Sequence, residues 1–382
     1  MSIRSKLPHL RPNIFSYISG LASQHKAINL AQGFPDFGCS PVLIDLLHKY
    51  SLKGLNQYAP GQGIPALRTQ ISAYLEKRDG HRYDADTEIT VSSGATEALF
   101  CSFAALINPG DEVIILEPAY DTYEPTIELF GGVVRRVQLQ APDFHVDWDE
   151  VKRCLNPKTK AIVLNSPHNP SGTLLSTDDL NQLSALLEGS AVTVISDEVY
   201  ADMVFSPHQH ISVSAIPALR ERSIVIGSFG KSFHVTGWKV GFFAAPLGLS
   251  AELRKIHSLS TFSVHTPSQF ALAELMTDPS HIAAVAGLYE QKKQYFLDGL
   301  KDSAWQFLPS QGSYFVTADY SHLSTADDMS YCHTLIQDHG IATIPYSAFY
   351  LQAPAAQRLI RFCFAKKETT LDQAIEILQR IR

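Results

Sequence analysis

The segment GSFGKSFHVTGWKVG places a hydroxyl group and two lysine amines close together, directly after the apolar run SIVIG. Its three chemically active residues are Ser228, Lys231 and Lys239. Like charges repel, and no acidic residue separates the two lysines. The spacing therefore predicts an anion bound nearby, or one lysine that is not kept as a cation.

Other polar groups follow other apolar runs at comparable positions. EITV is followed by SSGATEA, DEVIIL by EPAYDTY, KAIVLN by SPHNPSGT, and AVTVIS by DEVY. The carboxyl ends of parallel strands meet at one edge of a sheet, where ligands bind. The small-residue turn SSGA opens a helical pattern, and the free N–H groups of a helix start suit a phosphate. The pattern predicts one site that combines a phosphate cradle, an aromatic ring, an amide, a carboxylate, a tyrosine and a lysine.

The elements that must position these groups are strands alternating with helices. The expected strands lie at residues 88–91, 111–116, 132–139, 160–165, 191–196, 223–228 and 239–245. Helical patterns between several of them indicate βαβ units, and near-continuous apolar strands indicate a mostly parallel sheet covered by helices on both faces. From about residue 250 the pattern changes to longer helices and fewer strands. We therefore expect an α/β fold with a smaller α+β domain, completed by the N-terminal segment.

Composition excludes several classes of protein. The chain has 382 residues, 45% of them hydrophobic, and a formal net charge of −7, so it offers no basic surface for nucleic acid or acidic lipid. The chain has five scattered cysteines without a C-x-x-C pair, no apolar run long enough to span a bilayer and no secretory signal. We expect a cytoplasmic protein without a membrane or nucleic-acid partner.

Three motifs in this order, SPHNPSGT, DEVY and SFGKSFHVTGWKVG, resemble those of the fold-type I, class I pyridoxal-phosphate aminotransferases. The resemblance covers essentially the whole chain. Within this family, the chain most resembles the branch that contains bacterial methionine aminotransferases, kynurenine aminotransferases and glutamine transaminase K. The stretches that carry this resemblance are NLAQGFPDF, LNQYAP, EPAYDTYEP, GWKVG and RLIRFCFAKKE. It implies the fold of pyridoxal-phosphate-dependent transferases. It also implies a large cofactor-binding domain at residues 40–270 and a small domain formed by residues 1–39 and 271–382.

The resemblance assigns the opening lysines to pyridoxal 5'-phosphate. Lys231 would form the Schiff base with the cofactor aldehyde and, when released, act as a general base. Lys239 and Ser228 would face the phosphate dianion, which explains why two lysines are tolerated together. The start of the helix that faces the phosphate comprises Gly94, Ala95 and Thr96.

The cofactor ring would be held by residues at the other strand ends. Asp197 would pair with the pyridine nitrogen and favour the protonated ring, which makes the cofactor an electron sink. Tyr200 and Asn169 would hydrogen-bond the phenolate oxygen of the ring, and Tyr120 would stack on its face. Lys231, Asp197 and Tyr200 are the expected catalytic residues.

The substrate would bind through its α-carboxylate. A planar guanidinium grips a carboxylate at two points, which suits Arg361 in LIRFCF, and the backbone of Gly33 would lie against the same group. Asn169, Phe15 and Phe262 complete the expected substrate site. The reaction would be a ping-pong transamination from a hydrophobic, sulfur-containing or aromatic L-amino acid, methionine favoured, to a 2-oxo acid.

The resemblance also implies a homodimer, in which Tyr58 of NQYAP reaches the phosphate in the neighbouring active site. Several alternatives stay open: a kynurenine- or glutamine-type transaminase, a cysteine-conjugate β-lyase and, more distantly, a non-catalytic regulatory module. Ser263 stands where the kynurenine aminotransferases have a histidine, which disfavours kynurenine as the donor. No metal is expected, since His208 and His210 sit in a polar turn without a third ligand.

Overall fold

A seven-stranded sheet is the largest element of the computed structural model, which describes residues 5–10 and 12–382. The strand order is β2-β8-β7-β6-β5-β3-β4, and all neighbours are parallel except those of β8. The strands are β2 (Ile89–Ser92), β3 (Glu112–Glu117), β4 (Val133–Gln138), β5 (Thr159–Asn165), β6 (Thr193–Asp197), β7 (Ser223–Ser228) and β8 (Gly241–Ala244). All seven strands expected from the sequence are present, and the expected mostly parallel α/β fold is confirmed.

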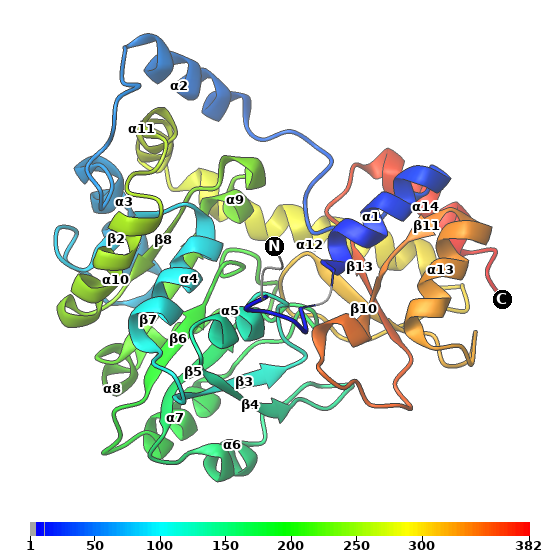
Figure 1. Cartoon of the computed structure of the whole chain (residues 1–382). Coiled ribbons are helices and arrows are strands. Elements are labelled where there is room, and N and C mark those ends of the chain that lie inside the picture. The colour runs from blue at the N-terminus through cyan, green and yellow to red at the C-terminus, as the bar shows by residue number, and fades with distance from the viewer. Residues whose placement is uncertain (1–4, 11) are drawn as a thin grey trace, which may run out of the picture.

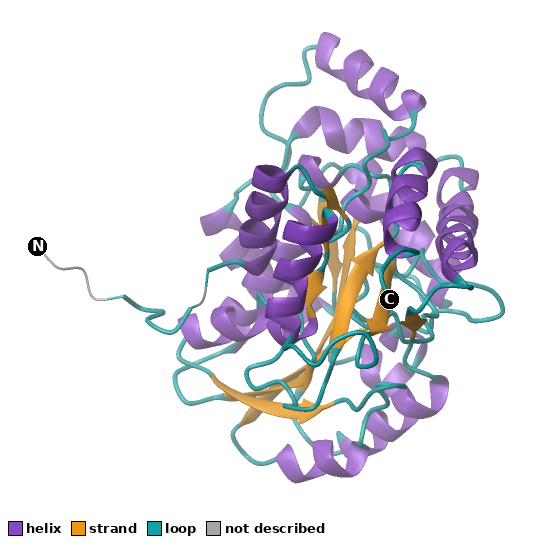
Figure 2. Cartoon of the chain, turned by 90° about the vertical axis from the view of Figure 1, so that its right-hand side faces the viewer, coloured by secondary structure: helices purple, strands orange, loops and turns teal. Residues whose placement is uncertain are grey.

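Helices cover both faces of this sheet, as Figure 2 shows. Alternate residues of β3 point to opposite sides: Val113 and Ile115 pack against one group of helices, and Ile114 and Leu116 against the other. The helices of the first group are α4 (Gly94–Leu106), α5 (Tyr123–Leu129) and α10 (Leu247–Ser260), and those of the second are α6 (Trp148–Cys154), α7 (Thr177–Leu186) and α8 (Pro217–Arg220). Each fully buried aliphatic side chain contributes about 1.5–3 kcal/mol, so this double layer explains the continuous apolar runs.

A third group of helices packs beside β2 and β8 around a separate apolar cluster. These helices are α2 (Pro41–Leu52), α3 (Pro65–Asp79), α9 (Phe229–Ser232) and α11 (Thr266–Leu275). Short 3-10 helices complete the connections: η1 (Val213–Ala215), η2 (Thr236–Trp238) and η3 (Tyr346–Phe349). The cluster holds α9, which carries Lys231, and the connection from α9 to β8, which carries Lys239.

A smaller antiparallel sheet of four strands, in the order β12-β13-β10-β9, lies in the C-terminal part of the chain. Its strands are β9 (Gln306–Phe307), β10 (Phe315–Asp319), β12 (Ile344–Pro345) and β13 (Leu359–Cys363). The helices α12 (Ser280–Leu300), α13 (Asp328–His339) and α14 (Glu368–Leu378) contribute to the same buried core. This sheet positions Arg361 at the centre of β13, opposite Thr317 of β10.

The N-terminal segment joins this smaller part. Helix α1 (Ile14–His25) packs against α13, and β1 (Ile28–Asn29) pairs in parallel with β11 (Ile341–Ala342). Figure 1 shows α1 in dark blue beside the orange and red elements of the C-terminal part. The division of the chain at residues 40 and 270 stays a prediction.

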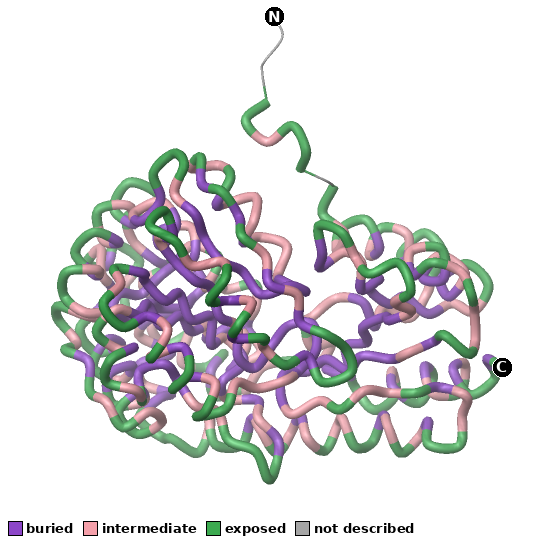
Figure 3. Tube along the Cα trace, turned by 90° about the horizontal axis from the view of Figure 1, so that it is seen from below, coloured by how far each residue is buried: buried purple, intermediate pink, exposed green. Residues whose placement is uncertain are grey.

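Buried residues gather in the interior, while residues 5–10, 12 and 13 are mostly exposed, as Figure 3 shows. Among the helices of the described residues, none combines the length and the apolar character that crossing a membrane requires.

Candidate active site

A cavity of about 190 Å³ lies at the carboxyl edge of the large sheet. It collects side chains from the ends of β5, β6 and β7 and from the start of α4. Ten of the residues singled out in the sequence line it: Gly94, Ala95, Thr96, Tyr120, Asn169, Asp197, Tyr200, Ser228, Lys231 and Lys239. The structure thus brings together groups that are separated by more than a hundred residues in sequence.

One end of the cavity is formed by the start of α4. Gly94 has a φ of +72°, and no side chain caps the helix, so its first N–H groups are available to a ligand. Gly241 permits the close approach of β8, since a Cβ there would lie 2.6 Å from the Gly227 carbonyl oxygen and 3.0 Å from the Ala95 nitrogen. The Lys239 Nζ lies 3.3 Å from the Thr96 Oγ1. A helix N-terminus, a hydroxyl and an ammonium together form an anion site.

Asp197 is buried at the end of β6. Its Oδ2 accepts a hydrogen bond of 2.7 Å from the Tyr123 hydroxyl, and its backbone oxygen accepts one of 2.8 Å from the Asn165 amide. Burial raises the pKa of Asp197 to about 6, against the opposing effect of the Tyr123 hydrogen bond. A cation brought into contact with this carboxylate would favour its ionised form.

Lys231 is half-buried in α9, three residues after the end of β7. Burial lowers the pKa of its amine to about 8, so a larger fraction of the amine is uncharged near neutral pH than in an ordinary lysine. The Lys231 Nζ donates a hydrogen bond of 2.8 Å to the Tyr314 hydroxyl and lies 3.5 Å from the Gly33 carbonyl oxygen. An uncharged amine on a mobile side chain can act as a nucleophile and as a base.

Arg361 is only 1% exposed, yet no carboxylate among the described residues forms an ion pair with it. Its Nη1 donates to the Asn169 Oδ1 at 2.6 Å and its Nη2 to the Ala31 carbonyl oxygen at 2.9 Å. Its guanidinium carbon lies 3.7 Å from the ring centre of Phe315. The buried Nε finds no hydrogen-bond partner among these residues. This guanidinium can therefore receive a carboxylate.

The remaining predicted residues fall into two groups. Phe15 lies near the substrate end, because its ring centre is 5.4 Å from the Arg361 guanidinium, and Gly33 is close to Lys231. Tyr58 and Phe262, in contrast, are 83% and 51% exposed, and their rings pack edge to face outside the cavity of their own chain. Within the single chain, neither residue lines the cavity.

Among the residues that were not singled out from the sequence, Asn165, Tyr123 and Tyr314 form hydrogen bonds with predicted site residues. Asn165 is the last residue of β5, so the strand-end argument could have identified it. Tyr123 lies in the EPAYDTY stretch but was not singled out from its neighbours. Tyr314 belongs to the region of the smaller sheet, and no local pattern signals its contact with Lys231.

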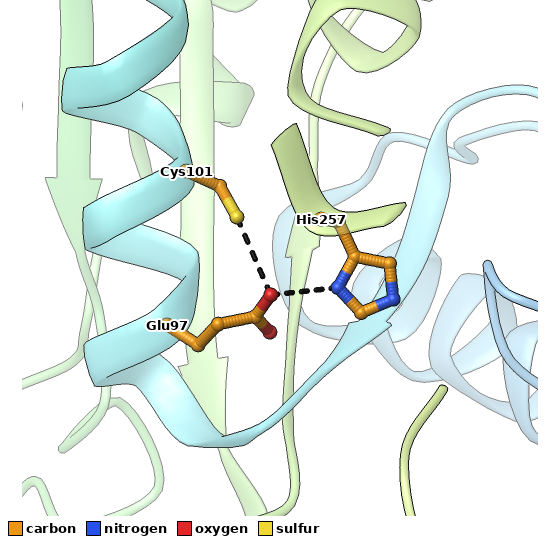
Figure 4. A group of neighbouring side chains, drawn as sticks. All are labelled: Glu97, Cys101 and His257. Carbon is orange, nitrogen blue, oxygen red and sulfur yellow. Dashed lines mark hydrogen bonds and ion pairs between the residues drawn. The ribbon is translucent and has the colours of Figure 1, made fainter. Parts of the chain in front are cut away.

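A cluster of Glu97, Cys101 and His257, shown in Figure 4, was also missed. The Glu97 Oε1 accepts from the Cys101 thiol at 3.4 Å and from the His257 Nδ1 at 2.7 Å. The His257 Nε2 lies 2.7 Å from the Gly61 carbonyl oxygen, so both ring nitrogens face acceptors and the charged imidazolium fits best. These ligand atoms lie within 4.8 Å of one another, but each already has a hydrogen-bond partner. We interpret the cluster as a brace that ties the Gly61 loop to α4.

His210 is less exposed than its turn suggested. Its Nε2 lies 3.0 Å from the Glu198 Oε2, and the same carboxylate pairs with Arg78 at 2.5 Å. Glu198, the carboxylate shared by His210 and Arg78, directly follows Asp197 in the sequence. It accounts for His210 as a structural residue, while His208 is exposed.

Comparison with known proteins agrees with this geometry. The family model described as aminotransferase class I and II matches residues 25–378. Methionine aminotransferase of Escherichia coli (strain K12) is 48% identical over 99% of this chain and 98% of its own length. Kynurenine–oxoglutarate transaminase 3 of Mus musculus is 34% identical over 98% of this chain and 89% of its own length. The crystal structure of Escherichia coli YbdL, for which a methionine aminotransferase function was identified, has a TM-score of 0.97, 47% identity and full coverage of both chains.

The chain belongs to the class I and II aminotransferase family. It is an aminotransferase, as the sequence motifs predict. The family implies a pyridoxal phosphate cofactor and amino acid and 2-oxo acid substrates.

The brace around His257 has a testable pH dependence. Burial disfavours the charged ring, but the Glu97 hydrogen bond and charge raise the pKa of His257 above its ordinary value of 6.5. A raised folded-state pKa adds stability that is fully present below pH 6.5 and lost as the pH rises through the folded value. His257→Gln should therefore lower the free energy of unfolding by about 1.5–3 kcal/mol at acidic pH, and by less at alkaline pH.

Denaturant unfolding at a series of pH values measures this difference. The exposed His208→Gln is the matched control and should follow the parent protein throughout. A deficit in His257→Gln that does not change with pH would contradict the charged brace.

Proposed function

We propose that this aminotransferase binds pyridoxal phosphate in the cavity and moves the amino group of methionine, or of a similar hydrophobic or aromatic L-amino acid, to a 2-oxo acid. The observation that carries the proposal is Arg361, a buried guanidinium without a carboxylate partner among the described residues. Arg361 donates a hydrogen bond to Asn169, and Asn169 lines the same cavity as Lys231. Chemistry on amino acids needs a group that recognises the carboxylate beside a half-buried amine with a lowered pKa.

The donor set at the start of α4 fits a phosphate. The N–H groups of Ala95 and Thr96, the Ser228 hydroxyl and Lys239 would hold it, since each offers a donor toward the same end of the cavity. The gap between α4 and β8 depends on Gly241, whose missing Cβ leaves the helix start accessible. A dianion here would also offset the charge of Lys239.

The other end of the cavity fits the pyridine ring. Asp197 would hold its protonated nitrogen, with Tyr123 keeping the carboxylate oriented. Tyr200 and Asn169 would contact the ring oxygen, and Tyr120 would cover the ring face. When bound, the cofactor supplies an electron sink that stabilises the carbanion left at the substrate Cα.

The chain's own residues then bind the substrate and move its proton. Arg361 would clamp the α-carboxylate, which fixes the direction of the Cα–H bond. Lys231 would hold the cofactor, be released by the substrate, and take the proton from Cα. Its lowered pKa suits this role, because an amine that is partly uncharged at neutral pH can accept a proton.

The surroundings of Arg361 favour an apolar side chain on the substrate. Phe15, Phe315 and Phe349 all lie with their ring centres within 5.4 Å of the guanidinium carbon. The similarity to the methionine aminotransferase of Escherichia coli supports methionine among the apolar donors. The same residues could also remove a leaving group from a cysteine conjugate, and product analysis separates this alternative.

A homodimer is also proposed. The rings of Tyr58 and Phe262 pack edge to face, and Leu259, three residues before Phe262 in sequence, is 85% exposed; we refer to these three exposed residues as the apolar patch. Two hydrogen bonds hold the loop that carries Tyr58. The Ser263 Oγ donates to the Ala59 carbonyl oxygen at 3.0 Å, and the Thr266 Oγ1 donates to the Gln57 carbonyl oxygen at 2.6 Å. A rigid loop that presents an aromatic ring to solvent suits a partner subunit, in which Tyr58 would reach the phosphate.

The predicted cytoplasmic location stays a prediction.

Substitution of Arg361 tests the substrate site. Arg361→Lys keeps the charge but loses the two-point grip, so kcat/KM for methionine with a 2-oxo acid acceptor should fall roughly 10- to 100-fold. Steady-state kinetics with methionine and with 3-(methylthio)propylamine, which lacks the carboxylate, measure the effect. The preference for methionine over the amine should shrink in the variant.

Arg358→Lys is the matched control, because among the described residues the Arg358 guanidinium donates only to the nearby carbonyl oxygens of Ala355 and Gln357. Its kinetics should equal those of the parent. An Arg361→Lys enzyme that still discriminates fully by the carboxylate would show that another residue binds it. No turnover of any apolar amino acid by the parent enzyme would overturn the substrate assignment.

The apolar patch predicts the oligomeric state. Sedimentation equilibrium should give twice the chain mass for the parent, and Leu259→Asp should shift it toward the single chain, because burying an unpaired charge is costly. Leu351→Asp, at a 47% exposed leucine outside the patch, is the control and should stay dimeric. A parent protein that sediments as a single chain rules out the proposed role of Tyr58.

A further inference from the structure

The buried hydroxyl of Tyr314 connects Lys231 to the N-terminal loop. The Lys231 Nζ lies 2.8 Å from this hydroxyl, and the hydroxyl lies 2.5 Å from the Gly33 carbonyl oxygen. Tyr314 is fully buried, at the junction where the smaller sheet meets the active-site cavity. None of the chemistry assigned so far uses it.

The direction of these two hydrogen bonds follows from the groups involved. A carbonyl oxygen can only accept, so the single proton of the Tyr314 hydroxyl is donated to Gly33. The phenolic oxygen is then an acceptor for the Lys231 amine. Burial raises the pKa of Tyr314 well above its ordinary value, which keeps this proton in place.

The Tyr314 ring is held rigidly on several sides. It packs edge to face against Tyr200, at 5.3 Å between ring centres, and against Phe315, and it contacts Tyr289 at 5.6 Å. Its backbone oxygen accepts a hydrogen bond of 3.1 Å from the Phe364 N–H. The hydroxyl therefore offers a fixed acceptor, whereas the lysine side chain that meets it has several rotatable bonds.

We propose that Tyr314 is a positioning residue that holds the free amine of Lys231 beside the Gly33 carbonyl oxygen. This inference rests on the proposed role of Lys231 in binding the cofactor and moving the Cα proton. A released lysine that is kept at one place reacts more often than one that samples many rotamers, and small misplacements can cost up to about 100-fold in rate. The hydrogen bond to Tyr314 thus prepares the amine for the proton transfer.

Several charged or titratable groups face the Lys231 amine besides Tyr314. They are Arg361 and Cys363 from β13, Asp197 from β6, Lys239 from the turn before β8, and Tyr200, whose ring centre lies 5.5 Å from the Lys231 Nζ. Replacing Tyr314 by phenylalanine keeps all of these groups and removes the acceptor of the Lys231 amine together with the hydrogen bond to the Gly33 carbonyl oxygen. Because the acceptor favours the charged amine, its loss should lower the pKa of Lys231 further.

The test compares Tyr314→Phe with Tyr289→Phe. The Tyr289 hydroxyl is buried without a hydrogen-bond partner among the described residues, so its removal is a matched control for loss of a buried phenol oxygen from the same aromatic group. In the cofactor-free protein, trace acetylation by acetic anhydride over a pH series, read by peptide mass spectrometry, gives the pKa of Lys231. Tyr314→Phe should lower this pKa by about one unit, and Tyr289→Phe should leave it unchanged.

The loaded enzyme supplies a second readout. With methionine as donor, Tyr314→Phe should reduce kcat about 10-fold with little change in KM, since the carboxylate contact at Arg361 is untouched. Equal pKa values and equal kcat in the two variants would overturn the positioning role. A crystal structure of the cofactor-free parent protein with Lys231 beyond hydrogen-bond reach of Tyr314 would also overturn it. This test does not depend on the folding of a variant. A parent enzyme without transaminase activity would refute the proposed function instead, while the acetylation series would still test the Lys231–Tyr314 bond.

Discussion

The organisation of the active site depends on a buried cation, Arg361, that has no carboxylate partner among the described residues. Taking a guanidinium out of water is costly unless hydrogen bonds and an opposite charge replace the solvent. The protein supplies part of this compensation through the Phe315 ring, the Asn169 amide oxygen and the Ala31 carbonyl oxygen. The rest is left for a ligand, and we propose that the substrate carboxylate provides it.

This constraint explains why two sheets are needed. Arg361 lies on β13 of the smaller sheet, whereas Asp197 and Lys231 lie at the ends of strands in the larger one. The hydrogen bond between Arg361 and Asn169 joins the two at the cavity. Burial then gives the site its acid–base character: it raises the pKa of Asp197 to about 6 and lowers that of Lys231 to about 8. Both shifts arise from the same low-polarity environment acting on groups of opposite charge.

Much of the larger sheet and its edge could be predicted from the sequence, because strand and motif patterns are local. The run KAIVLN predicts β5, and DEVY after AVTVIS places Asp197 at the end of β6. The strand-end rule then gathers Asp197, Asn169 and Lys231 at one edge without any knowledge of side-chain positions. These residues do line one cavity, although their roles toward the cofactor stay proposals.

The contacts that could not be predicted are those that depend on tertiary packing. Tyr314 meets Lys231 only because the smaller sheet packs against the end of the larger one. Glu97 and His257 are separated by 160 residues and meet only through the packing of α4 against α10. Periodicity carries no information on such pairs, because it reports which face of an element is buried but not which neighbour covers it.

The central claim is that one cavity binds both the cofactor and an apolar amino acid. The most direct measurement is the visible absorption spectrum of the enzyme loaded with pyridoxal phosphate, recorded while methionine is added without any 2-oxo acid. We expect the absorption band of the bound cofactor to disappear and one equivalent of 4-methylthio-2-oxobutanoate to be released per site. A band that methionine leaves unchanged, or release of ammonia and a thiol in place of that product, would contradict it.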